Sequence, residues 1–213
     1  DAKGQKTKDI AAGLTDVAKK FSDEAYNAYS LGDYALSSEL FEKAAAAAGK
    51  LVRGLIAVDT GMGRIGYLAD EAEAAAEDVK KIQALENFKI KGMFSHMSTA
   101  DAYDKTYSHQ QEEKYNKFYQ TLTAAGIDIP FKTLANSASI MELPEVYFDA
   151  CRPGIILYGC YPSDEVDRSQ LALRPAMSIK ANIIHLKKVP AGNSISYGRK
   201  FTTQRDSLIA TIP

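Results

Sequence analysis

The hydrophobic pattern of the first 150 residues alternates between two kinds of segment. Short apolar runs rich in β-branched residues predict buried strands, and longer segments with apolar residues three or four positions apart predict helices. The predicted strands are residues 25–31, 51–58, 90–95, 131–135 and 146–151. The predicted helices are residues 34–48, 69–85 and 105–125, with a short one from Ser137. Such alternation is typical of a parallel α/β sheet, either open or closed into a barrel.

The pattern changes toward the C-terminal end of the chain. Residues 177–189 and 207–213 are predicted strands, and residues 190–193, PAGN, are typical of a turn. We therefore expect two domains. The first is an α/β domain over residues 1–165, and the second is the start of a β-rich domain over residues 166–213.

The composition argues against several classes of function. The 213 residues carry a net charge of −1, so we expect neither nucleic acid nor an anionic membrane as a partner. No apolar run approaches the roughly 20 residues needed to span a bilayer, and no signal peptide is apparent. Cys151 and Cys160 are too few for a disulfide framework or a structural zinc site. We expect reduced core cysteines in a cytoplasmic protein, and no metal site.

The two ends of the chain carry little information about function. Residues 1–22 have a weak helical pattern around Ile10 and Leu14, and we assign them no role. The chain starts at Asp1 and stops at Pro213, directly after a predicted strand. We therefore expect both ends to be cuts in a longer protein.

One predicted strand ends in a glycine-rich turn, within residues 51–66, LVRGLIAVDTGMGRIG. Glycines let backbone N–H groups approach an anion, and Arg64 adds a positive charge. The spacing G-x-G-x-x-G also fits the dinucleotide-binding fingerprint, which requires an acidic residue at the end of the next strand. The next predicted strand is followed by His96 instead, which disfavours that interpretation. On this stretch alone, an ordinary strand-to-helix turn remains open.

Polar residues follow several of the predicted strands, at the edge where parallel α/β folds place their sites. They are Asp59, Thr60, Arg64, His96, Asn136, Ser137 and Arg152, followed by Gly154 and Ile155. The Ser137 hydroxyl and the N–H groups of Gly154 and Ile155, at predicted helix starts, suit a phosphorylated organic ligand. Each residue alone also has an ordinary explanation, such as a helix cap for Ser137 or a surface ion pair for Arg152.

Five segments resemble, in order, segments of the alanine racemases, which are pyridoxal-phosphate enzymes. They are VDTGMGRIG (58–66), FSHMSTAD (94–101), ANSAS (135–139), CRPGIILYG (151–159) and LRPAMSIKANIIHLKKVPAGNSISYG (173–198). The resemblance covers about residues 24–213. It implies the C-terminal half of a (β/α)8 TIM-type barrel, followed by part of a β-rich domain.

The resemblance also implies roles for individual residues. Those implied to hold pyridoxal 5'-phosphate are Arg152 on the pyridine nitrogen, Asn136, Ser137, Gly154 and Ile155. Arg64 matches the arginine near the substrate carboxylate, and His96 matches the histidine of the active-site hydrogen-bond network. Tyr197 matches the tyrosine that acts as the second catalytic base, in the site of the partner subunit of a homodimer.

The activity implied by the resemblance is interconversion of L-alanine and D-alanine, which supplies D-alanine for peptidoglycan by a lysine and tyrosine two-base mechanism. Two alternatives stay open. One is a related racemase acting on serine or on several amino acids. The other is a non-catalytic fragment, because the family's Schiff-base lysine motif, V-K-A-D-A-Y-G-H-G, has no match here. Ala57 also stands where the family often carries a carbamylated lysine or an asparagine, which leaves the orientation of Arg64 open.

Overall fold

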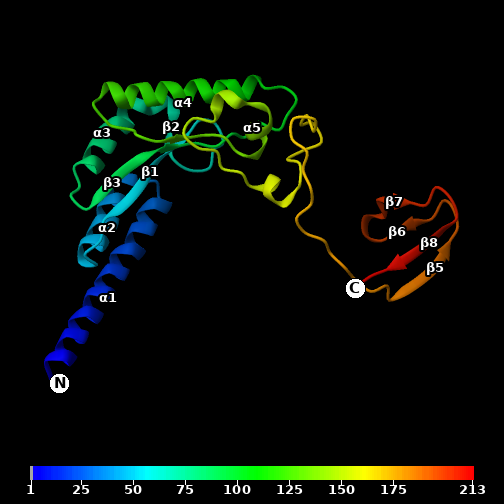
Figure 1. The fold of residues 1–213 in the computed structure, drawn as a ribbon, viewed down its shortest axis with the longest axis horizontal. Coiled ribbons are helices and arrows are strands. Elements are labelled where there is room, and N and C mark those ends of the chain that lie inside the picture. The colour runs from blue at the N-terminus through cyan, green and yellow to red at the C-terminus, as the bar shows by residue number, and fades with distance from the viewer. Residues whose placement is uncertain (1) are drawn as a thin grey trace. The chain divides into compact units, whose positions relative to one another are not determined.

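The computed structural model describes the backbone of residues 2–213 and the side chains of residues 13–213, so the side chain of Ile10 lies outside the described residues. It forms two compact units, residues 1–174 and 175–213 (Figure 1). The first unit contains α1 (Ala2–Ser30), α2 (Tyr34–Ala47), β1 (Val52–Asp59), β2 (Tyr67–Leu68), η1 (Ala69–Glu71), α3 (Ala72–Gln83), β3 (Phe88–Phe94), α4 (Thr106–Ala124), β4 (Lys132–Thr133), α5 (Ser137–Glu142), η2 (Pro144–Val146) and η3 (Ile155–Tyr158), where η denotes a 3-10 helix.

A four-stranded sheet with the order β2-β1-β3-β4 organises the first unit, and all its paired strands are parallel. The alternation of strands and helices along the chain therefore predicted the right class of sheet. Because the strands are parallel, the segments that follow β1, β3 and β4 emerge at one edge of the sheet. The predicted site residues that follow these strands accordingly start from the same edge.

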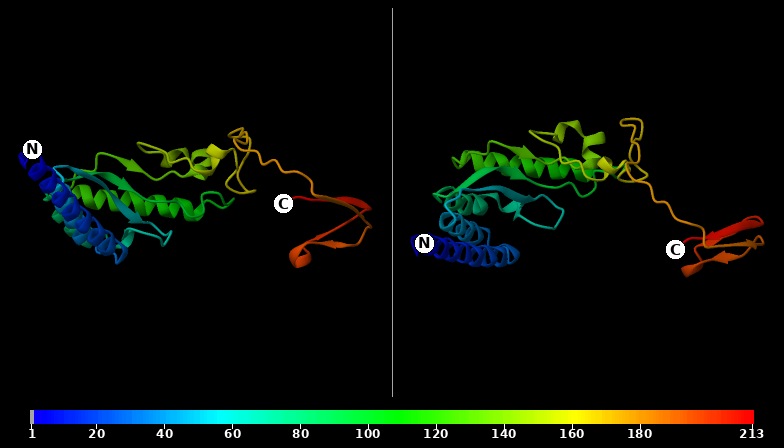
Figure 2. Two further views of the ribbon diagram at one scale, coloured as in Figure 1. Left: turned by 90° about the horizontal axis from the view of Figure 1, so that it is seen from below. Right: turned by 60° about the horizontal axis from the view of Figure 1, so that its bottom comes forward.

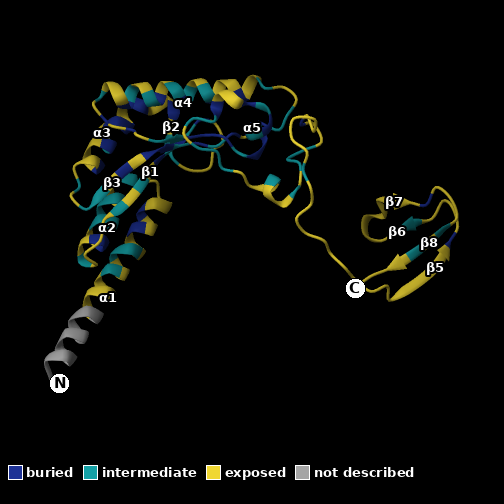
Figure 3. Cartoon of the chain, in the orientation of Figure 1, coloured by how far each residue is buried: buried dark blue, intermediate teal, exposed yellow. Residues whose placement is uncertain are grey.

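The core lies between the sheet and helices α3 and α4, the latter drawn in green in Figures 1 and 2. On β1, Ile56 and Val58 are buried, whereas Leu55 is exposed, as expected for a strand with one covered face. The α4 side chains buried in this core lie three or four positions apart along the helix. They are Tyr115, Phe118 and Leu122. Figure 3 colours the buried residues of the helices and strands dark blue.

The strand predicted at residues 25–31 is wrong, because this segment belongs to the helix α1, which forms a hairpin with α2 (blue in Figure 2). Ala25 and Ala28 are buried three positions apart, which is helical spacing. The hydroxyl of Ser37 on α2 donates to the carbonyl of Ala25, at 3.0 Å. Small side chains on α1 thus let the two helices approach closely.

The strand predicted at residues 146–151 is also wrong. Its first residue, Val146, is the last residue of the 3-10 helix η2. Phe148 has a φ of +48°, which interrupts extended backbone. The segment still runs beside β4, but one of the hydrogen bonds between them is made by the Asp149 side chain instead of a backbone carbonyl. The carboxylate of Asp149 accepts from the Lys132 N–H at 2.7 Å, and the Asp149 N–H donates to the Lys132 carbonyl at 3.1 Å.

The second unit is rich in β-structure, as predicted. Strand β5 (His185–Val189) pairs antiparallel with β8 (Ser207–Thr211), and β6 (Ser194–Ile195) pairs antiparallel with β7 (Phe201–Thr202), with the 3-10 helix η4 (Tyr197–Arg199) between the last two. The predicted turn at 190–193 is confirmed, but residues 177–184 form no strand.

Two further expectations concern the chain as a whole. Both cysteines are free, but only Cys151 packs against the core, while Cys160 is exposed, so the expectation of a core position fails for Cys160. Among the helices the structure describes, none has both the length and the apolarity that a membrane span requires.

Candidate active site

The glycine-rich turn after β1 folds around its own aspartate. One carboxylate oxygen of Asp59 accepts from the N–H groups of Gly61 at 2.9 Å and Gly63 at 3.0 Å. A dinucleotide-binding turn would offer such N–H groups to a phosphate, but here the carboxylate already uses them. The structure therefore supports the rejection of the dinucleotide interpretation.

The same turn brings Arg64 beside the segment after β3. Arg64 and His96 line one narrow cleft, together with Met62 and Ile65. The Arg64 side chain is exposed and makes no hydrogen bond or ion pair within the described part of the chain. Because Ala57 offers no polar group, nothing on β1 at this position can hold the guanidinium.

The Arg152 side chain is hydrogen-bonded to several groups at or just after the ends of β3 and β4. Its guanidinium donates to the Thr133 hydroxyl at 2.7 Å and to the Ser95 carbonyl, and it lies 3.4 Å from Nδ1 of His96. Arginine can only donate, so Nδ1 of His96 must accept, and the ring proton belongs on Nε2. The pair thereby fixes the tautomer of the histidine.

The environment of His96 favours its neutral form. Burial lowers the pKa of His96 below its ordinary value of 6.5, and the positive charges of Arg64 and Arg152 lower this pKa further. Burial also lowers the pKa of Arg152, but a guanidinium stays charged across the physiological range. The site therefore combines a fixed cation with a neutral imidazole.

The lowered pKa of His96 predicts a pH dependence of stability. The unfolded chain binds this proton more tightly than the folded chain, so the stabilising contribution is complete above pH 6.5 and is lost as the pH falls through the folded pKa. We expect an NMR titration of the His96 ring to have its midpoint below 6.5, and we expect His96→Gln to flatten the dependence of the unfolding free energy on pH. His185→Gln, at an exposed position on β5, is the control. A His96 midpoint at or above 6.5 would contradict this prediction.

The next polar group follows β4. Asn136 is the N-cap of α5, with its side-chain oxygen accepting from the N–H groups of Ala138 and Ser139, both at 3.1 Å. Its side-chain nitrogen donates to the Met97 carbonyl at 3.1 Å. The Asn136 amide is therefore occupied with holding α5 and the segment after β3 together.

Ser137 and Gly154 meet where α5 and η3 begin. The Gly154 N–H donates to the Ser137 hydroxyl at 2.8 Å. Ile155 is the first residue of η3, where N–H groups have no partner inside the helix. The structure therefore brings Ser137, Gly154 and Ile155 together, with the Gly154 N–H already bound to the hydroxyl.

Six of the eight predicted site residues line one cavity of about 310 Å³. They are His96, Asn136, Ser137, Arg152, Gly154 and Ile155, accompanied by Asp101, Ala138 and Pro162. Arg64 lies in the narrow cleft that shares His96 with this cavity. Tyr197 belongs to the second unit, where η4 carries it and its side chain is fully exposed.

The sequence interpretation missed Gln111, a fully buried residue of α4. Its side-chain nitrogen donates to the Thr60 hydroxyl and to the His96 carbonyl, both at 3.1 Å, and its oxygen accepts from the N–H and hydroxyl of Ser98 at 2.9 and 3.0 Å. Gln111 thus joins the turn after β1 to the segment after β3. The available signal was its position four residues before Tyr115, a polar residue on the apolar face of a helix.

Comparison with known proteins gives two family matches. The alanine racemase N-terminal domain matches residues 30–162, and the alanine racemase C-terminal domain matches residues 176–213. The alanine racemase of Clostridium novyi is 55% identical over 171 residues, which are 80% of this chain and 44% of that protein. The chain spans about half the length of the curated relatives it matches.

Solved structures agree with these matches. The alanine racemase of Clostridium difficile 630 has a TM-score of 0.69 at 38% identity, over 84% of this chain and 46% of that one. A histidine racemase from Leuconostoc mesenteroides has a TM-score of 0.65 at 26% identity, over 84% of this chain and 47% of that one. The fold is accordingly a partial barrel-type α/β domain followed by part of a β-rich domain. The chain belongs to the alanine racemase family.

Proposed function

We propose that this chain forms part of a pyridoxal-phosphate-dependent alanine racemase, which interconverts L-alanine and D-alanine. One observation carries the proposal. The residues expected to hold the cofactor, which come from two separate stretches of sequence, line a single cavity together with His96 from a third stretch. Its size and its mixture of a cation, a hydroxyl and backbone donors suit a small phosphorylated ring compound.

The donor set at this cavity fits pyridoxal phosphate. A phosphate group requires donors, which the Ser137 hydroxyl and the first N–H groups of η3 can supply. An added Cβ at Gly154 would lie 3.6 Å from the Ser137 hydroxyl, so residue 154 is in van der Waals range of this hydroxyl. Arg152 can donate to a pyridine nitrogen but cannot give up its proton, so that nitrogen would stay unprotonated.

Racemisation requires a proton to leave Cα from one face and return on the other. When bound, pyridoxal phosphate acts as an electron sink for the Cα electrons. We assign one of the two proton transfers to the Tyr197 hydroxyl of the partner subunit in a homodimer. His96, held by Arg152, would stabilise the deprotonated tyrosine by hydrogen bonding through Nε2, and Arg64 would bind the substrate carboxylate.

The second base of this family is a lysine, whose motif has no counterpart in these 213 residues. The complete reaction therefore needs that lysine in addition to the residues described, and we expect these residues alone to be inactive. We place the enzyme in the cytoplasm and its product in peptidoglycan synthesis, as for the racemases it resembles.

The activity is tested by following conversion of L-alanine to D-alanine by the native protein with pyridoxal phosphate added, with serine and histidine as competing substrates. Fastest turnover of alanine supports the proposal. Faster turnover of another amino acid supports a related racemase, an alternative favoured by the similarity to a histidine racemase. Binding of the cofactor without any racemisation supports a non-catalytic fragment.

The cofactor cradle makes a separate prediction. We expect Ser137→Ala to weaken binding of pyridoxal phosphate about tenfold or more, because a hydrogen bond to a charged group contributes about 1.5–3 kcal/mol. Binding of pyridoxal, which has no phosphate, should change little. Ser30→Ala is the matched control, because this exposed serine at the end of α1 lies outside the cavity lining and its hydroxyl donates only to the Tyr26 carbonyl. Equal losses for both ligands in fluorescence titrations would show that Ser137 does not contact the phosphate.

A further inference from the structure

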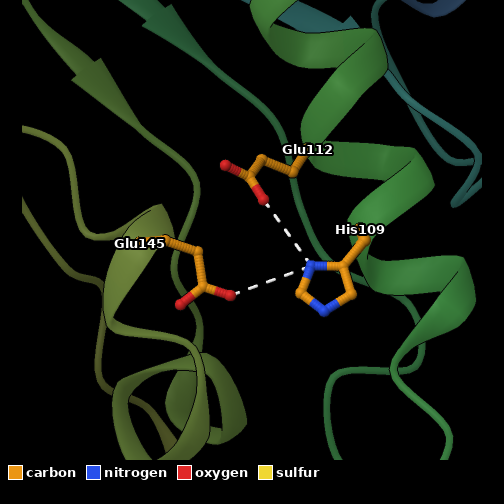
Figure 4. A group of neighbouring side chains, drawn as sticks. All are labelled: His109, Glu112 and Glu145. Carbon is orange, nitrogen blue, oxygen red and sulfur yellow. Dashed lines mark ion pairs between the residues drawn. The ribbon is translucent and has the colours of Figure 1, made fainter.

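A second group of chemically active side chains lies outside the cavity, where α4 faces η2. His109 and Glu112 stand one turn apart on α4, and Glu145 belongs to η2. Figure 4 shows both carboxylates directed toward the same imidazole nitrogen. Nδ1 of His109 is 3.7 Å from an oxygen of Glu112 and 3.8 Å from an oxygen of Glu145, and all three atoms lie within 4.8 Å of one another.

These three atoms converge without bonding directly to one another. Both distances from Nδ1 exceed the 3.5 Å limit of a hydrogen bond, so the atoms surround a gap instead of closing it. Within the described residues, neither Glu112 nor Glu145 forms an ion pair with a lysine or arginine. Two carboxylates brought this close repel each other, and a cation held between them removes that repulsion.

The spacing is close to that of a tetrahedral metal site. Zinc holds nitrogen and oxygen ligands at about 2.0–2.2 Å, which places two ligands of a tetrahedral site about 3.4 Å apart. The two distances from Nδ1, 3.7 and 3.8 Å, are somewhat longer than this value, and the two carboxylate oxygens lie within 4.8 Å of each other. One imidazole nitrogen with two carboxylates suits zinc better than calcium or magnesium, which prefer oxygen ligands alone.

We propose that His109, Glu112 and Glu145 bind one Zn²⁺ ion. The side chains of His109 and Glu145 are 52% and 41% exposed, so the ion would be reached from solvent and would keep water as its fourth ligand. We expected no metal site because the chain has only two cysteines. That argument does not apply to this site, since none of the three proposed ligands is a cysteine.

The bound ion would hold together two segments that lead to the cavity, without itself lining the cavity. Helix α4 follows the segment that carries His96, and η2 follows α5, which starts at Ser137. None of the three ligands lines the cavity, so the ion takes no part in its chemistry. The Lys105 ammonium and the Glu142 carboxylate, 2.6 Å apart, already join the same two segments, and the ion would add a second link between them.

The proposal is tested by titrating the chelator-stripped chain with ZnCl2 in a calorimeter and by measuring its melting temperature with and without the metal. We expect one saturable site per chain and a higher melting temperature with zinc. His109→Ala should abolish both effects, and Glu112→Gln or Glu145→Gln should weaken binding at least tenfold. His185→Ala, an exposed histidine on β5, is the matched control and should retain binding.

His109 and Glu145 are exposed and Glu112 is only partly buried, so these variants should fold and melt like the parent when a chelator is present. Titration with Co²⁺ adds a spectroscopic check, since thiolate ligation by Cys151 or Cys160 would give an intense charge-transfer band. A weak visible spectrum without that band, lost in His109→Ala, supports the site. Absence of saturable binding, binding that survives His109→Ala, or a thiolate band would overturn it.

Discussion

Replacing Gly92 with alanine is expected to reduce the free energy of unfolding by about 4 kcal/mol or more, an exceptional loss for one methyl group. Gly92 lies in β3 with a φ of +152°, which L side chains rarely adopt. A Cβ at this position would lie 2.0 Å from the carbonyl oxygen of Phe131 and 2.7 Å from its carbonyl carbon. The clashing atoms are backbone, so no side-chain rotation can relieve the contact.

Relief of that contact would separate β3 from the chain leading into β4. The Met93 N–H donates to the same Phe131 carbonyl at 2.8 Å, and the pairing of Met93 with Lys132 follows directly. Both segments lead into the cavity, at His96 and Asn136. We therefore expect Gly92→Ala to disturb cofactor binding together with stability, as measured by urea unfolding and by titration with pyridoxal phosphate.

Gly126→Ala is the control that separates the clash from the backbone strain. Gly126 also has a positive φ, +82°, but an added Cβ would meet no atom within 4 Å. Its substitution should lower the free energy of unfolding only by the cost of placing alanine at a positive φ, about 1–3 kcal/mol. If Gly92→Ala lowers the free energy of unfolding no more than Gly126→Ala does, the Cβ of residue 92 fits beside Phe131 and the prediction is wrong.

The sequence predicted most of the elements because their periodicity is local. Helix α4 was recognisable from apolar residues spaced at helical intervals, and β1 from an apolar run that contains β-branched residues and leads into Asp59. The two wrong strands had no such support. At residues 25–31 small and polar residues left the period undecided, and at residues 146–151 a single positive φ, at Phe148, ended the extended backbone.

The site was predictable to the extent that it follows from topology. Parallel strands end at one edge, so His96 and Asn136 had to start from neighbouring positions. The engagement of the Gly61 and Gly63 N–H groups by Asp59 could not be predicted, because it depends on the path of the turn in three dimensions. The same holds for the approach of Glu145 to His109, which joins residues 36 positions apart.

Replacing Gln111 with leucine is expected to cost about 3 kcal/mol of stability and to loosen the segment that carries His96. Leucine fills a similar volume but removes the donor to the His96 carbonyl and the acceptor for the Ser98 N–H. Buried polar groups left without partners cost about 1–3 kcal/mol each. The Thr60 hydroxyl keeps one partner, the Ser95 hydroxyl at 2.9 Å, so the loss there is smaller.

A change in stability alone would not separate positioning of His96 from ordinary core packing. The pKa of His96 does so, because it is lowered mainly by burial. If Gln111→Leu frees the segment after β3, the imidazole gains contact with water and its pKa rises toward 6.5. An NMR titration of the His96 ring in the parent and the variant measures this shift.

Gln110→Leu is the matched control, since it makes the same substitution one residue earlier on the exposed side of α4. It should leave both the unfolding free energy and the His96 titration close to those of the parent. If Gln111→Leu lowers stability while the His96 pKa stays unchanged, Gln111 holds α4 to the sheet without positioning the histidine. If the pKa rises only in Gln111→Leu, the buried amide that joins the turn after β1 to the segment after β3 also sets the protonation of the candidate active site.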